Sequence, residues 1–170
     1  MTVWLYRLAG IALAALVMVV DQWLKLHLIW ETPLKRAPIE LLPFFRFAYV
    51  ENYGVSLGML TADSFEMRWL LVGFTSLIAA GVLIWILRER KLPDILALGL
   101  VLGGAAGNIR DRADRGFVVD YADLHFGNFR PFLVFNLADA AISIGVVIIL
   151  ARSLLSRDKP HSAADAAPET

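Results

Sequence analysis

The chain contains no cysteine, which excludes disulfide bonds, thiolate metal sites and a cysteine nucleophile. Histidine is also scarce, and because His27, His125 and His161 are far apart in the sequence, we do not expect a zinc enzyme. There is no excess of charge of either sign, since 16 Lys and Arg residues balance 16 Asp and Glu residues. A neutral chain lacks the positive field that attracts nucleic acid, so no nucleic-acid partner is expected.

Apolar residues, by contrast, are abundant. They make up 58% of the 170 residues, well above the share in typical soluble domains. Residues 69–87 carry no charge and residues 131–151 carry only that of Asp139, so both runs satisfy the requirement of about 20 apolar residues for a spanning helix. The composition therefore predicts a membrane protein that is mainly α-helical.

The first apolar run, residues 8–20, is shorter than a membrane span. It reaches spanning length only if the helix continues through Asp21 and Lys25 to about residue 29. A signal peptide is the alternative, but no small-residue cleavage pattern follows the run. We therefore expect a retained helix.

Residues 95–109 form a short run with a regular pattern of glycine. Gly99, Gly103 and Gly107 recur at every fourth position, and such a stripe allows another helix to approach closely. We expect a packed third span and, because the stripe can be covered within one chain, a monomer.

Two segments outside the spans, residues 30–68 and 110–130, are predicted to form a small β-sheet on the outer side of the membrane. Apolar residues alternate along 45–49, and a second short strand is expected at 117–124, before a turn at 127–128. The predicted fold is a four-transmembrane-helix bundle with this sheet, forming one domain over residues 1–152. The spans are expected at about 8–29, 69–87, 95–109 and 131–151.

The distribution of cations predicts the orientation. Residues 88–91 place three cations in four positions, whereas the cations of the other two connecting segments are diluted by carboxylates. We expect a multi-pass membrane protein with both termini on the inner, cytoplasmic side. Residues 153–170 lose their apolar character and are predicted to be a disordered cytoplasmic tail.

Asp139 is the one charged residue of the last predicted span. With a helix that starts at residue 131, it would lie about 12 Å along the axis, where insertion of a carboxylate costs roughly 2.5 to 3.5 kcal/mol. Intramembrane charges often mark a functional path, but a structural carboxylate bonded to another helix remains open. Asp21 is expected at a similar depth, where Lys25 can pair with it at i, i+4, so both are interpreted as supports.

Asp120 is harder to distinguish, because Asp111, Asp114 and Asp123 share its segment and most loop aspartates are solvated. Its apolar neighbours predict partial burial, which would raise the pKa of its carboxyl group.

Five short motifs follow one another in the chain. They are DQWLK at 21–25, ENYGVS at 51–56, GGAAGNIRDR at 103–112, GFVVD at 116–120 and FNLAD at 135–139. Together they resemble lipoprotein signal peptidase, also called signal peptidase II, over nearly the whole chain except the tail. The resemblance implies four transmembrane helices with a periplasmic sheet, and an aspartic endopeptidase that cleaves the signal peptide before a diacylglyceryl-modified cysteine of bacterial prolipoproteins.

The same resemblance implies that Asp120 and Asp139 are the catalytic pair, near the periplasmic face of the bacterial inner membrane. It implies no metal or cofactor, and its partners are diacylglyceryl prolipoproteins and membrane phospholipid. Tyr121, where phenylalanine is common, and the extra cation Arg110 are small departures from the family pattern. The positions implied to support the pair or the bound substrate are Asp21, Lys25, Asn52, Gly54, Asn108, Arg112 and Asn136.

Two close carboxyl groups cannot both ionise readily, so one can act as a base toward water while the other donates a proton. Which aspartate holds the proton is left open. A small proton-coupled transporter is the main alternative, because intramembrane aspartate and lysine also form proton relays, although the chain shows no internal repeat. A noncatalytic lipid-binding or assembly protein held together by the glycine stripe is the second alternative.

Overall fold

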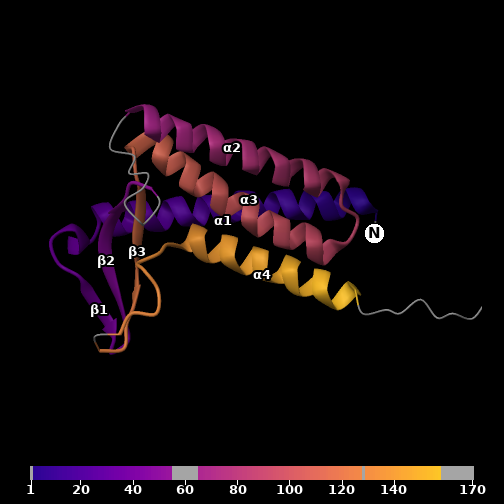
Figure 1. Ribbon diagram of the computed structural model, residues 1–170. Helices are drawn as coiled ribbons and strands as arrows, with labels where there is room; N and C mark the ends of the chain where they lie inside the picture. Colours follow the sequence, from indigo (N-terminus) through magenta and orange to yellow (C-terminus); the bar gives the residue numbers. More distant parts are fainter. Residues whose placement is uncertain (1, 55–64, 128, 158–170) are drawn as a thin grey trace, which may run out of the picture.

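The computed structural model describes residues 2–54, 65–127 and 129–157, and Figure 1 shows these residues as a helical bundle with a small sheet at one end. The helices are α1 (Val3–Trp30), α2 (Phe65–Arg88), α3 (Leu92–Arg115) and α4 (Leu137–Arg157). The strands are β1 (Ile39–Leu42), β2 (Phe45–Asn52) and β3 (Val118–Leu124), with a short 3-10 helix, Pro33–Lys35, before β1.

All four helices are long and apolar enough to cross a membrane. Many of their large apolar side chains face outward: Leu77 is 72% exposed and Val147 is 64% exposed. An apolar surface of this extent on a helical bundle is compatible with lipid rather than water. The predicted class, a four-helix membrane protein with a small sheet, is confirmed.

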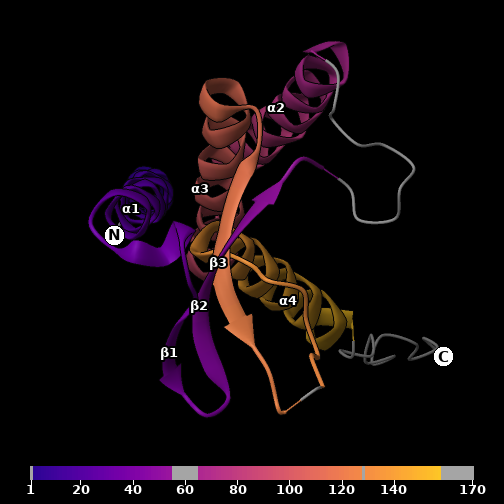
Figure 2. The same cartoon turned by 90° about the vertical axis from the view of Figure 1, so that its left-hand side faces the viewer.

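Helix α3 is the centre of the bundle, with α1, α2 and α4 packed around it (Figure 2). Glycine permits this close packing: a Cβ atom at Gly103 would lie 2.5 Å from the Ala14 carbonyl oxygen of α1, and one at Gly104 would collide with the Ala138 backbone of α4. The glycine stripe is thus covered by α1 of the same chain.

The ends of α3 and α4 differ from the predicted spans. Helix α4 begins at Leu137 rather than at residue 131, because Phe135 pairs with β3: the Phe135 N–H donates to the Ala122 carbonyl at 3.0 Å, and the Ala122 N–H donates back at 2.7 Å. This pairing needs extended backbone, which a helix cannot supply. Asp139 therefore lies in the first turn of α4, not about 12 Å along it.

All four helices extend beyond their predicted spans: α1 already begins at Val3, and α2 begins at Phe65, within the predicted outer segment 30–68. Helix α3 runs on through residues 110–115 and stops at Gly116, whose φ of 90° forms a left-handed C-cap that suits glycine. Helix α4 continues through residues 153–157, so the predicted tail begins later than expected. The rest of that tail, 158–170, lies outside the described residues.

The sheet has the order β1-β2-β3 with antiparallel neighbours, and it covers the end of the bundle (Figure 1). Val50 of β2 lies opposite Asp120 of β3. Residues Leu28, Leu34 and Tyr121 form a buried core beneath the sheet. This core holds β3 on the helix ends and brings Asp120 to the bundle. Of the predicted turn, Gly127 has a φ of 62°, and residue 128 lies outside the described residues.

Candidate active site

Asp120 lies on β3 with only 2% of its surface exposed. Two side-chain amides hold its carboxyl group: Asn136 Nδ2 donates to Oδ1 at 2.6 Å and Asn52 Nδ2 donates to Oδ2 at 3.0 Å. The Asn52 amide is oriented by a turn, because its Oδ1 accepts the Gly54 N–H at 3.0 Å. Gly54 has a φ of 142°, a backbone conformation that favours glycine.

Asp139 belongs to the cap at the start of α4. Its N–H donates to Asn136 Oδ1 at 2.9 Å, and its Oδ2 accepts the Asn136 N–H at 3.2 Å, which together form a capping box. Asn108 Nδ2 of α3 donates to Asp139 Oδ1 at 2.8 Å. The cap and the Asn108 amide together fix the orientation of the Asp139 carboxyl group.

Asn136 links the two aspartates. Its side chain bonds both Asp120 and Asp139, and its backbone N–H bonds Asp139. One residue thus sets the separation and orientation of Asp120, on a strand, and Asp139, on a helix. The motif FNLAD therefore supplies a cap, a carboxylate and a bridge to the second carboxylate.

The surroundings of Asp120 raise the pKa of its carboxyl group to about 6. Burial is the largest cause and the charge of Asp139 is the second. The hydrogen bonds from Asn52 and Asn136, and the charge of Lys25, act in the opposite direction. A buried carboxyl group with a raised pKa beside a second carboxyl group has the arrangement expected of an acid–base pair.

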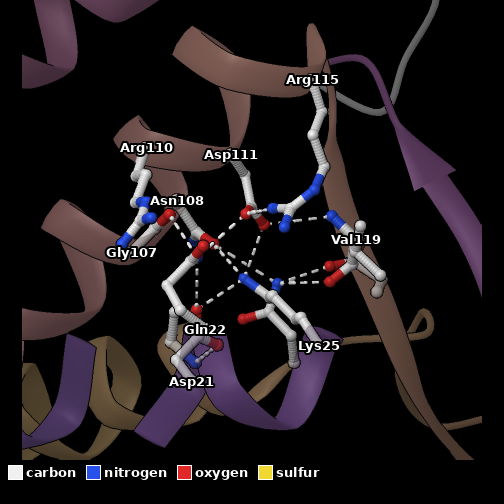
Figure 3. Close-up of polar contacts among 12 residues, drawn as sticks. Asp21, Gln22, Lys25, Gly107, Asn108, Arg110, Asp111, Arg115 and Val119 are labelled. Atoms are coloured by element: carbon white, nitrogen blue, oxygen red, sulfur yellow. Dashed lines mark hydrogen bonds and ion pairs between the residues drawn. The ribbon is translucent and has the colours of Figure 1, made fainter. Parts of the chain in front are cut away.

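A buried ion cluster lies beside the pair, and Figure 3 shows its side chains converging from α1 and α3. Lys25 Nζ lies 2.7 Å from Asp21 Oδ2 and 2.8 Å from Asp111 Oδ2, and all three side chains are fully buried. Gln22 Nε2 donates to Asp111 Oδ1 at 2.9 Å. Arg115 also pairs with Asp111.

This cluster reaches both elements that hold Asp139. Lys25 Nζ donates to Asn108 Oδ1 at 3.4 Å, which leaves the Asn108 amide N–H for Asp139. Asp21 Oδ1 accepts the Ala138 N–H at 3.1 Å and so holds the first turn of α4. Removal of one member of such a buried cluster leaves an uncompensated charge, at a cost of about 3 to 5 kcal/mol.

Arg112 is half-buried on α3, and its charge interacts with both Asp139 and Asp120. Its Nε is buried and has no hydrogen-bond partner within the described ranges. Arg68 of α2 donates through Nε to the Arg112 carbonyl at 2.7 Å and also bonds the Ala113 carbonyl. Helix α2 thereby holds the turn of α3 that carries Arg112.

The structure brings together the nine site residues expected from the sequence around one end of the bundle. Sequence reasoning missed Asp111, Gln22 and Arg68. Asp111 could have been found, because it follows Gly107 by four positions and so continues the stripe that faces α1. Gln22 and Arg68 make contacts with distant residues, for which the sequence shows no pattern.

Among the residues that the structure describes, no three His, Cys, Asp or Glu side chains are grouped so that they could hold a metal ion. The two carboxyl groups are surrounded by three asparagine side chains and the charge of the Arg112 guanidinium group. Such a set can bind a polar substrate and transfer protons.

The chain is similar to known proteins over most of its length. A family model described as signal peptidase (SPase) II matches residues 13–155. The lipoprotein signal peptidase of Rhizorhabdus wittichii is 52% identical, covering 91% of this chain and 90% of the relative. That of Sphingopyxis alaskensis is 46% identical, covering 96% and 94%.

Two solved structures described as bacterial membrane enzymes have a similar fold. The first has a TM-score of 0.76 at 24% identity and covers 95% of this chain and 94% of its own. The second has a TM-score of 0.75 at 27% identity and covers 89% and 94%. The helical bundle and its sheet are thus a fold known from experiment.

Proposed function

The chain belongs to the signal peptidase II family, and on this premise we propose that it removes the signal peptide from diacylglyceryl-modified bacterial prolipoproteins. The relatives with the highest identities quoted above bear the name lipoprotein signal peptidase and align over nearly their whole length. The transporter alternative has no comparable support.

The observation that carries the mechanism is the link between Asp120 and Asp139 through Asn136. The bond of Asn136 Nδ2 to Asp120, at 2.6 Å, and the capping box with Asp139 hold two carboxyl groups of different surroundings in one site. We propose that Asp139, which accepts N–H donors at a helix N-terminus, is the ionised member. Asp120 is then the proton donor, and with a pKa raised to about 6 it holds that proton mainly below this pH.

In the proposed reaction, Asp139 takes a proton from a water molecule as the water oxygen attacks the scissile carbonyl carbon. Asp120 donates its proton to the carbonyl oxygen, so the tetrahedral intermediate carries no net charge on that oxygen. As the intermediate collapses, the C–N bond breaks, the proton on Asp139 moves to the leaving amine, and a hydroxyl proton of the intermediate returns to Asp120 as the carbonyl forms again. Arg112 and Asn52 are placed to contact the peptide, and Lys25 and Asp21 act as positioning residues.

The proposed site lies near the periplasmic face, and both termini are cytoplasmic. Support comes from the cation-rich turn 88–91, which lies at the end of the bundle away from the sheet (Figure 1). Because Asp120 comes from a strand and Asp139 from the first turn of a helix, the pair lies at the membrane boundary. A lipid-modified cysteine can stay in the bilayer there while its peptide bond reaches the pair.

The test is conversion of a diacylglyceryl-modified prolipoprotein to its cleaved form by the purified chain, followed on a gel. Asp120→Asn and Asp139→Asn should each reduce the rate by at least about a hundredfold, because acid–base catalysis contributes on that order. Asp114→Asn is the matched control, since Asp114 lies nearby on α3 with its side chain 61% exposed. Cleavage retained in either dyad variant would remove that aspartate from the mechanism, and an inactive wild type would contradict the proposed activity.

A further inference from the structure

A groove of about 550 Å³ lies at the end of the bundle opposite the aspartate pair. Its walls are α2 and α4, which both pack on α3 but diverge from each other (Figure 2). Trp85 of α2, Leu98 of α3 and Ile149 of α4 are among the residues that line it. This groove has no part in the site described above.

The inner part of the groove is apolar. Leu98, which is 1% exposed, forms the floor, while Trp85 and Ile149 form parts of the two walls. These residues belong to helices that are long and apolar enough to span a membrane, so the surrounding medium is hydrocarbon. An acyl chain is the ligand that matches such a lining.

The rim of the groove and the turn beside it carry more cations than carboxylates, namely Arg88, Arg90, Lys91 and Arg152 against Glu89 and Asp94. Asp94 is neutralised by Arg152, whose Nε and Nη2 bond its two carboxylate oxygens. The Glu89 side chain accepts the backbone N–H groups of Arg90 at 2.8 Å and of Lys91 at 3.0 Å. Both carboxylates of the rim therefore already have partners.

The cations of the turn between α2 and α3, residues 88–91, are in contrast free to bind a phosphate group. Within the ranges that the structure describes, Arg88, Arg90 and Lys91 form no ion pair, and all three are exposed. Lys91 lines the groove itself. The unpaired positive charge stands directly above the apolar lining, as a lipid with a negative headgroup would require.

We propose that this groove binds one anionic phospholipid, with its phosphate at Lys91 and its acyl chains along Leu98 and Ile149. A zwitterionic phospholipid fits the lining equally but gains less at the rim, because its ammonium group faces the same cations. The inference depends on the groove and its charges and does not rest on the proposed peptidase activity.

The experiment uses quenching of tryptophan fluorescence by brominated lipid in vesicles that contain the full chain. Dibrominated phosphatidylglycerol or dibrominated phosphatidylcholine is added at increasing fractions to unbrominated phosphatidylcholine. The signal of Trp85 is obtained as the difference between the wild type and Trp85→Phe. We expect phosphatidylglycerol to bind at Trp85 about fivefold more tightly than phosphatidylcholine. This is the factor that one cation near a charged headgroup contributes.

Lys91→Gln should remove this preference, so that both lipids quench Trp85 alike. Arg110→Gln is the matched control, because Arg110 is an exposed cation at the other end of the bundle, with its side chain 52% exposed, and it should leave the preference unchanged. Equal quenching in the wild type, or a preference that survives Lys91→Gln, would overturn the proposal. If neither lipid quenched Trp85, protein rather than lipid would cover the groove, and the proposal would be overturned as well.

Discussion

At the scale of single residues, the candidate site depends on asparagine side chains that each make more than one bond. Asn52 accepts the Gly54 N–H with its oxygen and donates to Asp120 with its nitrogen. Asn108 accepts from Lys25 and donates to Asp139 in the same way. An amide that is fixed at its oxygen presents its N–H group in a defined direction, so the carboxylates receive donors from a preorganised environment.

The first prediction concerns the pH dependence of cleavage. If the protonated form of Asp120 is required, the rate should fall as the pH rises through about 6, where this carboxyl loses its proton. The Asn52 amide stabilises the ionised form of Asp120 and lowers its pKa. Asn52→Ala should therefore raise that pKa and shift the alkaline limb of the pH–rate profile to higher pH.

The measurement is kcat/KM for prolipoprotein cleavage between about pH 4 and 9, a range that spans both ordinary and raised carboxyl pKa values. Glu51→Gln is the control, because Glu51 is an exposed neighbour on β2 that has no contact with Asp120. A shift of the limb to lower pH in Asn52→Ala would contradict the assigned role of this amide.

At the scale of elements, α3 holds the site together because three helices and β3 contact it. Its small residues allow α1 to approach, and the same face then carries Asn108 and Asp111 to Lys25. The distance between α1 and α3 is therefore coupled to the geometry of the ion cluster. A change in packing at the glycine stripe should reach the aspartate pair.

The second prediction is that Gly103→Ala lowers stability by about 1 to 3 kcal/mol, because the added Cβ would lie 2.5 Å from the Ala14 carbonyl oxygen and must push the helices apart. Thermal unfolding in detergent should show a lower midpoint, and the cleavage rate should fall with it. Gly81→Ala is the matched control, since a Cβ at Gly81 of α2 meets nothing within 4 Å. Equal midpoints for the two variants would refute the packing argument.

At the scale of the whole molecule, the two ends of the bundle differ in structure and charge. The sheet, the ion cluster and the aspartates are at one end, whereas the cation-rich turn and the groove between α2 and α4 are at the other (Figure 1). The proposed orientation places the first end toward the periplasm and the second toward the cytoplasm.

The third prediction tests this orientation by cysteine labelling, for which the chain has no background because it lacks cysteine. Asp114→Cys should react with a membrane-impermeant maleimide in intact spheroplasts, since this exposed position lies at the sheet end. Arg90→Cys should react only after the membrane is permeabilised. The reverse pattern would invert the proposed topology and move the site to the cytoplasm.

The sequence by itself determined the class of the molecule. Hydropathy and length are local properties, so four spanning helices were predicted, and the alternation along residues 45–49 predicted a strand where β2 lies. The order of the motifs also indicated the family, because each motif is a short local pattern that needs no knowledge of contacts.

The tertiary structure decided what depends on contacts between distant residues. The start of α4 is fixed by the pairing of Phe135 with Ala122. Asp111 can be buried because it forms an ion pair with Lys25, which lies far earlier in the chain. No local pattern contains either contact. The link of Asp120 to Asp139 through Asn136 likewise forms only when β3 lies on the start of α4, because hydrogen bonds between side chains require the elements to be already in place.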